Sequence, residues 1–183
     1  MKTKNILVLG LMAMATVALT GCSDSFLEEE NPSADPVDEY YLTDAHLQEA
    51  VVAAYDPLHW PDWGNGGYNP INISSDIMAD DINVGGATAS DNLFWQLMAN
   101  YSANSNNTLA ALWVDEYSGV KRCNDVIAYV ANAQASGKSD VTEAKALDYT
   151  TQARVLRAYY YMNLRKFWGN IPFSTTNLTA NYQ

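Results

Sequence analysis

Three carboxylates between residues 76 and 81 are the first side chains whose type and spacing could do chemistry. Asp76 and Asp80 are four positions apart, so they would share one face of a helix, and Asp81 follows directly. Glycoside hydrolysis uses two carboxyl groups about 5 to 10 Å apart across a sugar cleft. Clusters of Asp and Asn also bind calcium, although this spacing does not match an EF-hand loop. A hydrolytic pair, a calcium site and a solvated helix face are therefore the alternatives here.

Aromatic residues in a segment rich in glycine and proline form the second candidate site. The segment from residue 59 to residue 70 is expected to be a loop, because its Gly and Pro residues interrupt regular structure. Exposed aromatic side chains there are unfavourable unless they bind a ligand or pack back onto the protein. Aromatic faces suit the apolar face of a sugar ring, while amides and carboxylates orient its hydroxyls. The candidate ligand-binding residues are Trp60, Trp63, Tyr68, Trp95 and Asp81. The alternative is that these aromatics seal the scaffold or contact another protein.

Several catalytic motifs are missing from the chain. It has no phosphate-binding loop, HExxH motif, paired CxxC motif or nucleophile elbow. A catalytic Cys123 would need a histidine base, and only His46 and His59 occur. Cys123 is instead expected to be a buried, small apolar residue. We therefore expect no catalytic residue, no structural metal site and no enzyme activity.

The N-terminus has the features of an export signal. Lys2 and Lys4 precede an apolar run from residue 6 to residue 19, which is short for a permanent bilayer span of about 20 residues. The run ends in Leu-Thr-Gly followed by Cys22, which resembles the bacterial lipobox. In a lipobox the cysteine receives diacylglycerol and becomes the new N-terminus. Residues 1–21 are therefore expected to be a signal peptide, and Cys22 to carry acyl chains that anchor the protein stably.

An acidic tether is expected to follow the anchor over residues 22–37. Glu28, Glu29 and Glu30 form a block of like charge, and Pro32 and Pro36 oppose regular structure. This acidic run also resembles the surface-export signal of Bacteroidetes lipoproteins. Loss of Lys2 and Lys4 changes the net charge from −11 to −13. Such a charge argues against nucleic acids and anionic membrane surfaces as partners.

The rest of the chain, residues 38–183, is expected to be one all-α domain. Helices are predicted from about Thr43 to Tyr55, from Ile73 to Asp80 and after a cap at Asp91. Two longer helices are predicted over residues 109–134 and from Asp140 to about residue 168. Their apolar stripes follow spacings of three and four, and a short turn joins them. Such helices pack antiparallel as an αα-hairpin.

The most specific string in the chain runs from Ala153 to Leu164, with the sequence Ala-Arg-Val-Leu-Arg-Ala-Tyr-Tyr-Tyr-Met-Asn-Leu, and is followed by Trp-Gly-Asn-Ile-Pro-Phe at residues 168–173. It resembles the signature of the SusD/RagB family of Bacteroidetes outer-membrane nutrient-binding lipoproteins. The departures are mild: Gln152 replaces an acid, Val155 a Phe and Asn170 an Asp. The structural residues of this signature are Arg154, Arg157, Tyr160, Gly169 and Pro172, and Arg157 is expected to pair with a carboxylate.

The resemblance implies a fold and a function. The fold would be a scaffold of tetratricopeptide-like antiparallel helix pairs with long loops rich in aromatics and glycine. Because family members are considerably longer, residues 38–183 would be incomplete at the C-terminus. The protein would bind an oligosaccharide or another nutrient, facing the cell exterior on the outer membrane, as the lid of a SusC-type TonB-dependent transporter.

Two other functions are weighed against this one. Helix-pair scaffolds commonly bind only proteins, so a helical interaction module of the envelope is the main alternative. The remote alternative is an envelope glycoside hydrolase that uses Asp76 and Asp80. Turnover of a polysaccharide that depends on these two residues would favour the hydrolase.

Overall fold

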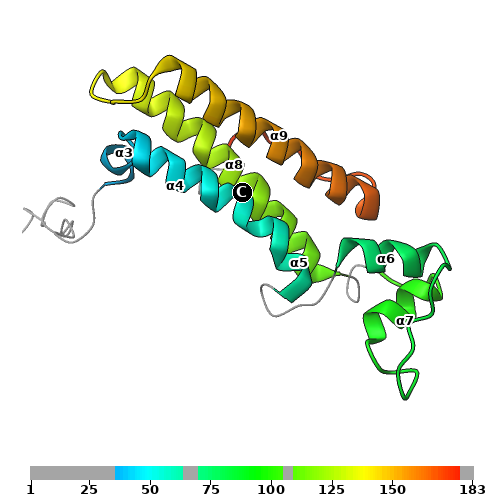
Figure 1. Ribbon diagram of the computed structural model, residues 1–183. Coiled ribbons are helices and arrows are strands. Elements are labelled where there is room, and N and C mark those ends of the chain that lie inside the picture. The colour runs from blue at the N-terminus through cyan, green and yellow to red at the C-terminus, as the bar shows by residue number, and fades with distance from the viewer. Residues whose placement is uncertain (1–35, 64–69, 105–108, 178–183) are drawn as a thin grey trace, which may run out of the picture. The chain divides into compact units, whose positions relative to one another are not determined.

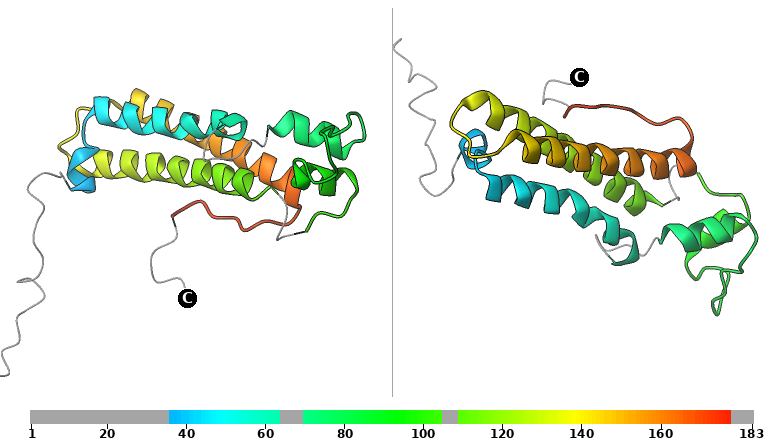
Figure 2. Two further views of the ribbon diagram at one scale, coloured as in Figure 1. Left: turned by 90° about the horizontal axis from the view of Figure 1, so that it is seen from below. Right: turned by 45° about the horizontal axis from the view of Figure 1, so that its top comes forward.

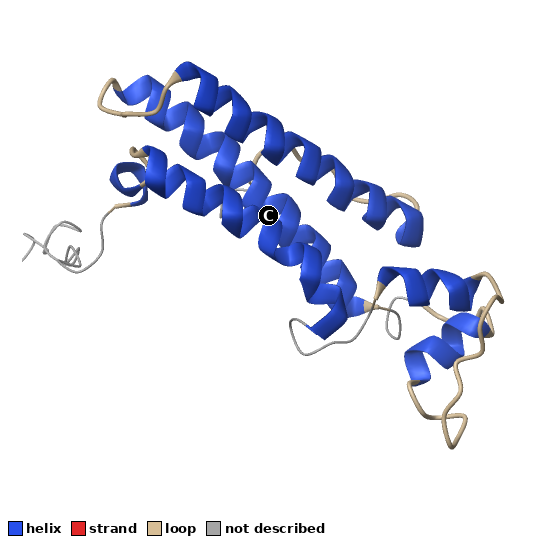
Figure 3. Cartoon of the chain, in the orientation of Figure 1, coloured by secondary structure: helices blue, strands red, loops and turns tan. Residues whose placement is uncertain are grey.

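The computed structural model describes residues 36–63, 70–104 and 109–177, and within these ranges the chain consists of helices, turns and loops without a strand (Figure 3). The prediction of an all-α fold is therefore confirmed. None of the helices in these ranges is long and apolar enough to cross a lipid bilayer. The elements are α3 (Val37–Tyr40), α4 (Asp44–Tyr55), the 3-10 helix η1 (Asp56–His59), α5 (Trp60–Trp63), α6 (Ile71–Met78), α7 (Leu93–Ala99), α8 (Ala110–Ser136) and α9 (Glu143–Trp168).

The two long helices α8 and α9 form an antiparallel hairpin (Figure 1). Gly137 ends α8 in the left-handed conformation, with φ of 67°, which a residue without a side chain adopts at little cost. Thr142 begins α9 by accepting a hydrogen bond from the backbone N–H of Lys145. The hairpin packs closely at Gly119, where an added Cβ would lie 2.5 Å from ring atoms of Tyr160.

Helix α4 packs against both helices of the hairpin, parallel to α9 and antiparallel to α8 (Figures 1 and 2). At one end Asp44 pairs with Lys145 and accepts a hydrogen bond of 2.8 Å from the hydroxyl of Tyr149. Further along, the buried hydroxyl of Tyr160 donates to the carbonyl oxygen of Ala54 at 2.7 Å. The shared core is built mostly from small and branched side chains of the three helices. This three-helix arrangement is the tetratricopeptide-like scaffold.

A second apolar cluster joins the short helices to the end of the hairpin. Ile77 of α6 and Met98 of α7 are buried together with Leu109 and Leu112 at the start of α8. The half-buried side chains of Phe167 and Trp168 at the end of α9 pack against the same cluster. Apolar contacts therefore hold helices α6 and α7 to the end of the hairpin.

The predicted loop over residues 59–70 is partly wrong. Pro57 is buried and occupies the first turn of η1, where its missing N–H and fixed φ are tolerated, and the chain continues as helix to residue 63. Residues 64–69 lie outside the described part of the chain. A described loop covers residues 79–92, where Gly85 and Gly86 both have positive φ.

Two predicted caps and both predicted boundaries of α6 are also wrong. Asn92, with φ of 47°, precedes α7, while the Asp91 carboxylate accepts hydrogen bonds from the backbone N–H groups of Ala87 and Thr88. Asp140 does not cap α9, because its carboxylate accepts from the backbone N–H of Asp44. Helix α6 begins two residues before the predicted start and ends at Met78.

Candidate functional site

Residues 170–177 form an extended segment, called here the strap, that runs back along the hairpin (Figure 2). Gly169 ends α9 with φ of 72°, and Pro172 opposes further helix. The Tyr117 hydroxyl donates to the carbonyl oxygen of Pro172 at 2.7 Å. The Tyr161 hydroxyl donates to the carbonyl of Ser174 at 2.7 Å and accepts from its N–H. Side chains of both helices therefore fix the path of the strap.

Arg157 connects the strap to α8. One guanidinium nitrogen, Nη1, donates to the side-chain oxygen of Asn124 at 2.6 Å and to the carbonyl oxygen of Thr175 at 2.9 Å. The predicted pairing of Arg157 with a carboxylate is wrong, because its partners are an amide oxygen and a main-chain carbonyl. Arg154 is exposed and forms no hydrogen bond or ion pair within the described ranges. The two signature arginines therefore differ in role.

A groove of about 390 Å³ lies between α8, α9 and the strap, and we call it the strap groove. Its apolar wall includes Phe173, which is 71% exposed and packs against Tyr161 with ring centroids 4.7 Å apart. The polar side chains of Lys121, Asn124 and Asn177 also line the strap groove. The residues that we use to define the groove are Val120, Lys121, Asn124, Tyr161, Phe173 and Asn177. An exposed aromatic ring beside amide and ammonium groups is chemically suited to a polyhydroxylated ligand.

A second hollow, of about 340 Å³, lies between α4 and α8 and shares Lys121 with the strap groove. Trp60 lines it, together with Tyr41 and Tyr129, whose rings stack 3.9 Å apart. The guanidinium of Arg122 lies 4.7 Å from the centre of the Trp60 ring. Arg122 also donates to the carbonyl of Ala53 and to the Asp56 carboxylate. Trp60 is thus held by a cation–π contact.

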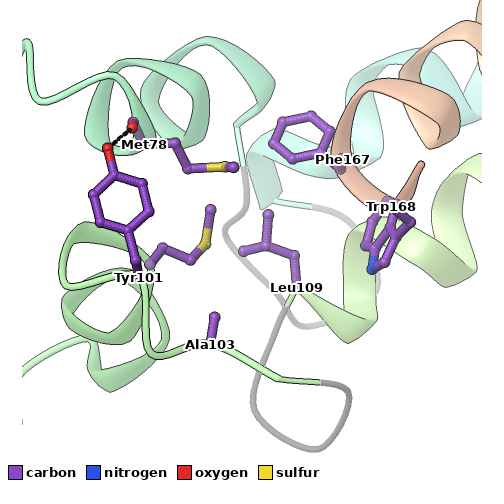
Figure 4. Close-up of a pocket in the computed structure, with 7 residues that line it drawn as sticks. Met78, Tyr101, Ala103, Leu109, Phe167 and Trp168 are labelled. Atoms are coloured by element: carbon purple, nitrogen blue, oxygen red, sulfur yellow. Dashed lines mark hydrogen bonds between the residues drawn. The ribbon is translucent and has the colours of Figure 1, made fainter.

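A third pocket, of about 270 Å³, lies at the end of the hairpin beside α6 and α7 (Figure 4). Met78, Met98 and Leu109 line it, with Phe167 and Trp168 on the α9 side. Tyr101 bridges its rim by donating a hydrogen bond of 2.9 Å to the carbonyl oxygen of Met78. Because this lining is mainly apolar, the pocket offers few groups that could orient sugar hydroxyls.

The candidate ligand residues from the sequence do not gather into one described site. Trp60 lies in the hollow between α4 and α8, whereas Trp95 packs half-buried against the apolar cluster of α6 and α7. Asp81 is exposed in the turn after α6. The side chain of Trp63 and the whole of Tyr68 lie outside the described part of the structure. A role in ligand binding stays a prediction for all five of these residues.

The carboxylates at residues 76–81 are all exposed, at the end of α6 and in the turn that follows. Within the described ranges, no cluster of three or more His, Cys, Asp or Glu side chains could hold a metal ion. Cys123 is fully buried, as expected, and burial raises the pKa of its thiol to about 12. At neutral pH this thiol is therefore protonated and unreactive.

The unusual carboxyl group is Glu116, inside the hairpin. It is 3% exposed and accepts a hydrogen bond of 3.2 Å from the side-chain amide of Asn163. The pKa of Glu116 is raised to about 8, mainly by burial; the hydrogen bond from Asn163 lowers it, and charge repulsion from Asp115 adds to the increase. No local sequence pattern marks Glu116 as buried, because its burial depends on which face of α8 meets α9.

The fold and these hollows define a class: an all-α scaffold of packed helices with aromatic-lined grooves along it. The chain belongs to a SusD-like family whose description is starch-binding and associating with the outer membrane, because the family model matches residues 25–183. The SusD/RagB resemblance of the signature is thereby confirmed.

Solved structures with high sequence identity share this fold. Surface glycan-binding protein A from Bacteroides uniformis is 52% identical, with a TM-score of 0.69 over 74% of this chain and 29% of that one. Its counterpart from Bacteroides thetaiotaomicron, in complex with laminarihexaose, is 53% identical with a TM-score of 0.67, over 73% of this chain and 28% of that one. A curated SusD-like protein from Bacteroides ovatus is 29% identical over 88% of this chain and 28% of its own length. The chain thus spans less than a third of the length of these relatives.

Proposed function

We propose that this protein captures glycans at the cell surface and belongs to a nutrient-uptake system. The observation that carries the proposal is the identity of 52–53% with surface glycan-binding proteins over about three quarters of the chain. The aromatic-lined grooves along α8 support it, because they combine apolar ring faces with hydrogen-bonding groups.

The proposed location is the outer leaflet of the outer membrane, with the protein facing the exterior. Its support is the family description, which includes association with the outer membrane, together with the lipobox that ends at Cys22. The proposed partner is a SusC-type TonB-dependent transporter, which would take the captured glycan inward. In this role the protein holds its ligand without cleaving it.

The ligand class proposed first is an oligosaccharide of the laminarin type. One of the similar structures contains laminarihexaose, and another is named a laminarin-binding SusD-like protein, at 26% identity. The family description names starch, so maltohexaose is the matching competitor in a test of preference. Both are glucose hexasaccharides, and they differ in linkage.

Calorimetric titration of the full chain in detergent micelles with laminarihexaose and with maltohexaose tests the proposal. We expect saturable binding of laminarihexaose. We also expect that the hexasaccharide is recovered uncleaved after incubation with the protein. Absence of binding to both hexasaccharides would refute glycan capture, and shortened products would favour the hydrolase.

The same titration tests the predicted aromatic residues. Trp60→Ala and Trp63→Ala are expected to weaken binding about tenfold each if their rings stack on sugar. Tyr159→Ala is the matched control, because Tyr159 is a half-exposed aromatic on α9 outside every groove described above. Unchanged binding in both tryptophan variants would eliminate these two residues as ligand contacts.

A further inference from the structure

We propose that the strap groove is a binding site for a pyranose unit of the captured glycan, separate from the predicted aromatic residues. The inference rests on the proposed function, because it assumes that a glycan is the ligand. It assigns a binding role to Phe173 and Asn124, neither of which was a candidate from the sequence. The strap groove combines an exposed ring that is held in place with an amide group whose nitrogen has no partner among the described residues.

The ring of Phe173 is an apolar platform in a fixed position. It is 71% exposed, yet the adjoining main chain is tied down, since the carbonyls of Pro172 and Ser174 accept hydrogen bonds from Tyr117 and Tyr161. Its ring also contacts that of Tyr161, which is only 8% exposed. A ring that is already ordered loses little conformational entropy when the C–H face of a sugar stacks on it.

Asn124 supplies a directed hydrogen-bond donor. The residue is 5% exposed and lines the groove. Because a guanidinium can only donate, the contact with Arg157 fixes the Oδ1 atom of Asn124 as the acceptor and thereby orients the whole amide. The other amide atom, Nδ2, has no hydrogen-bond partner among the described residues. The buried side-chain atoms without a partner do not include Nδ2, so this atom is open to solvent at the groove, and a ligand hydroxyl that replaces water there can accept its hydrogen bond.

Further polar groups lie at the open side of the groove. The ammonium of Lys121 is 2.7 Å from the Asp125 carboxylate, and the side chain of Asn177 donates to the same carboxylate. These groups can exchange hydrogen bonds with several hydroxyls. The groove volume of about 390 Å³ lies within the range of about 300 to 1,000 Å³ typical of small-molecule sites. The site therefore suits one ring of a longer oligosaccharide.

Nuclear magnetic resonance of the isotope-labelled full chain in detergent micelles tests the inference. Laminarihexaose is titrated while the side-chain amide signals of Asn124 and the backbone amide signals of the strap are followed. We expect these signals to shift and saturate together, with the same dissociation constant as in calorimetry. If calorimetry detects binding and these signals stay unchanged, the groove assignment is wrong while the proposed function stands.

Two substitutions separate ligand contact from structural support. Asn124→Asp keeps an oxygen for Arg157 but removes the amide donor, and Phe173→Ala removes only an exposed ring. Each is expected to raise the dissociation constant at the strap groove about tenfold. Tyr159→Ala should leave it unchanged. Unaltered titrations in both groove variants would overturn the inference, and absence of any glycan binding by the unsubstituted chain would overturn the proposed function as well.

Discussion

At the scale of single residues, Glu116 is a carboxyl group that the fold keeps protonated. The pKa of about 8 means that at neutral pH the folded protein holds a proton that the unfolded chain releases near its ordinary value of 4.5. Below about pH 4.5 the carboxyl is protonated in both states. Between pH 4.5 and 8 only the folded state binds the proton, so the contribution of Glu116 to stability falls as pH rises. Above about pH 8 this contribution changes no further.

Glu116→Gln is therefore expected to stabilise the protein increasingly from pH 5 to pH 8. Glutamine mimics the neutral carboxyl and keeps an oxygen for Asn163, so the gain at pH 8 relative to pH 5 should be on the order of a few kcal/mol. Urea unfolding at both pH values measures it. Asp76→Asn is the matched control, because it makes the same kind of change at an exposed carboxylate. A gain from Glu116→Gln that is independent of pH would contradict the proton-binding account.

At the scale of secondary-structure elements, the contact between α8 and α9 depends on the absence of a side chain at Gly119. Tyr160 is 1% exposed, its hydroxyl is bonded to α4, and its ring faces Gly119, so it has little room to move. This residue pair joins all three long helices of the scaffold at one point. Because the packing is this close, a methyl group added at Gly119 would push α8 and α9 apart.

Gly119→Ala should therefore destabilise the protein, by about 1 to 3 kcal/mol or more, despite the higher helix propensity of alanine. The measurement is the midpoint of urea unfolding, followed by circular dichroism. Gly137→Asn provides the comparison, since Gly137 has open space around it and asparagine tolerates a positive φ. A Gly119→Ala variant as stable as the unsubstituted chain would show that Tyr160 can move away from α8.

The sequence predicted the long helices better than the elements around them. Helices α8 and α9 have extended apolar stripes and a capping or terminating residue at their ends, so local patterns determine them. Pro57 was misleading, because proline both limits an α-helix and suits the first turn of the next one. Asp91 was misleading because the loop amides of residues 87 and 88 compete for its carboxylate.

The strap groove could not be predicted from local patterns. Tyr117 and Pro172 are 55 positions apart, and the contact joins a side chain to a main-chain carbonyl, which imposes no residue type on the strap. Arg157 was recognised as structural, but a guanidinium on an exposed helix face gives no sign of its partner. The burial of Glu116 likewise depends on which face of α8 meets α9. The strap contacts, the partners of Arg157 and the burial of Glu116 are all determined by three-dimensional packing.

At the scale of the whole molecule, the described scaffold lies within residues 36–63, 70–104 and 109–177, and the proposed lipid anchor, Cys22, precedes it. The proposed acylation of Cys22 assigns different roles to the two cysteines, since Cys123 is sealed in the core. A tethered scaffold with a net charge of about −13 would be repelled by anionic membrane surfaces.

Cys22→Ser is expected to abolish incorporation of radiolabelled palmitate and to release the protein from the membrane fraction, because no acyl chain would remain. Cell fractionation and palmitate labelling measure the two effects. Cys123→Ala is the paired control, and it should leave both labelling and fractionation unchanged. Palmitate incorporated into the Cys22→Ser variant would exclude Cys22 as the acylated residue.

The way the strap is held determines which substitutions this scaffold can accept during evolution. Tyr117, Tyr161 and Arg157 bind main-chain atoms of Pro172, Ser174 and Thr175, so attachment depends little on the strap's own side chains. Those side chains can therefore be exchanged without detaching the segment. Successive substitutions in residues 173–177 would reshape one wall of a groove while its opposite wall on α8 stays constant. A strap attached in this way can change its side chains, and with them the chemistry of the groove wall, while the fold stays the same.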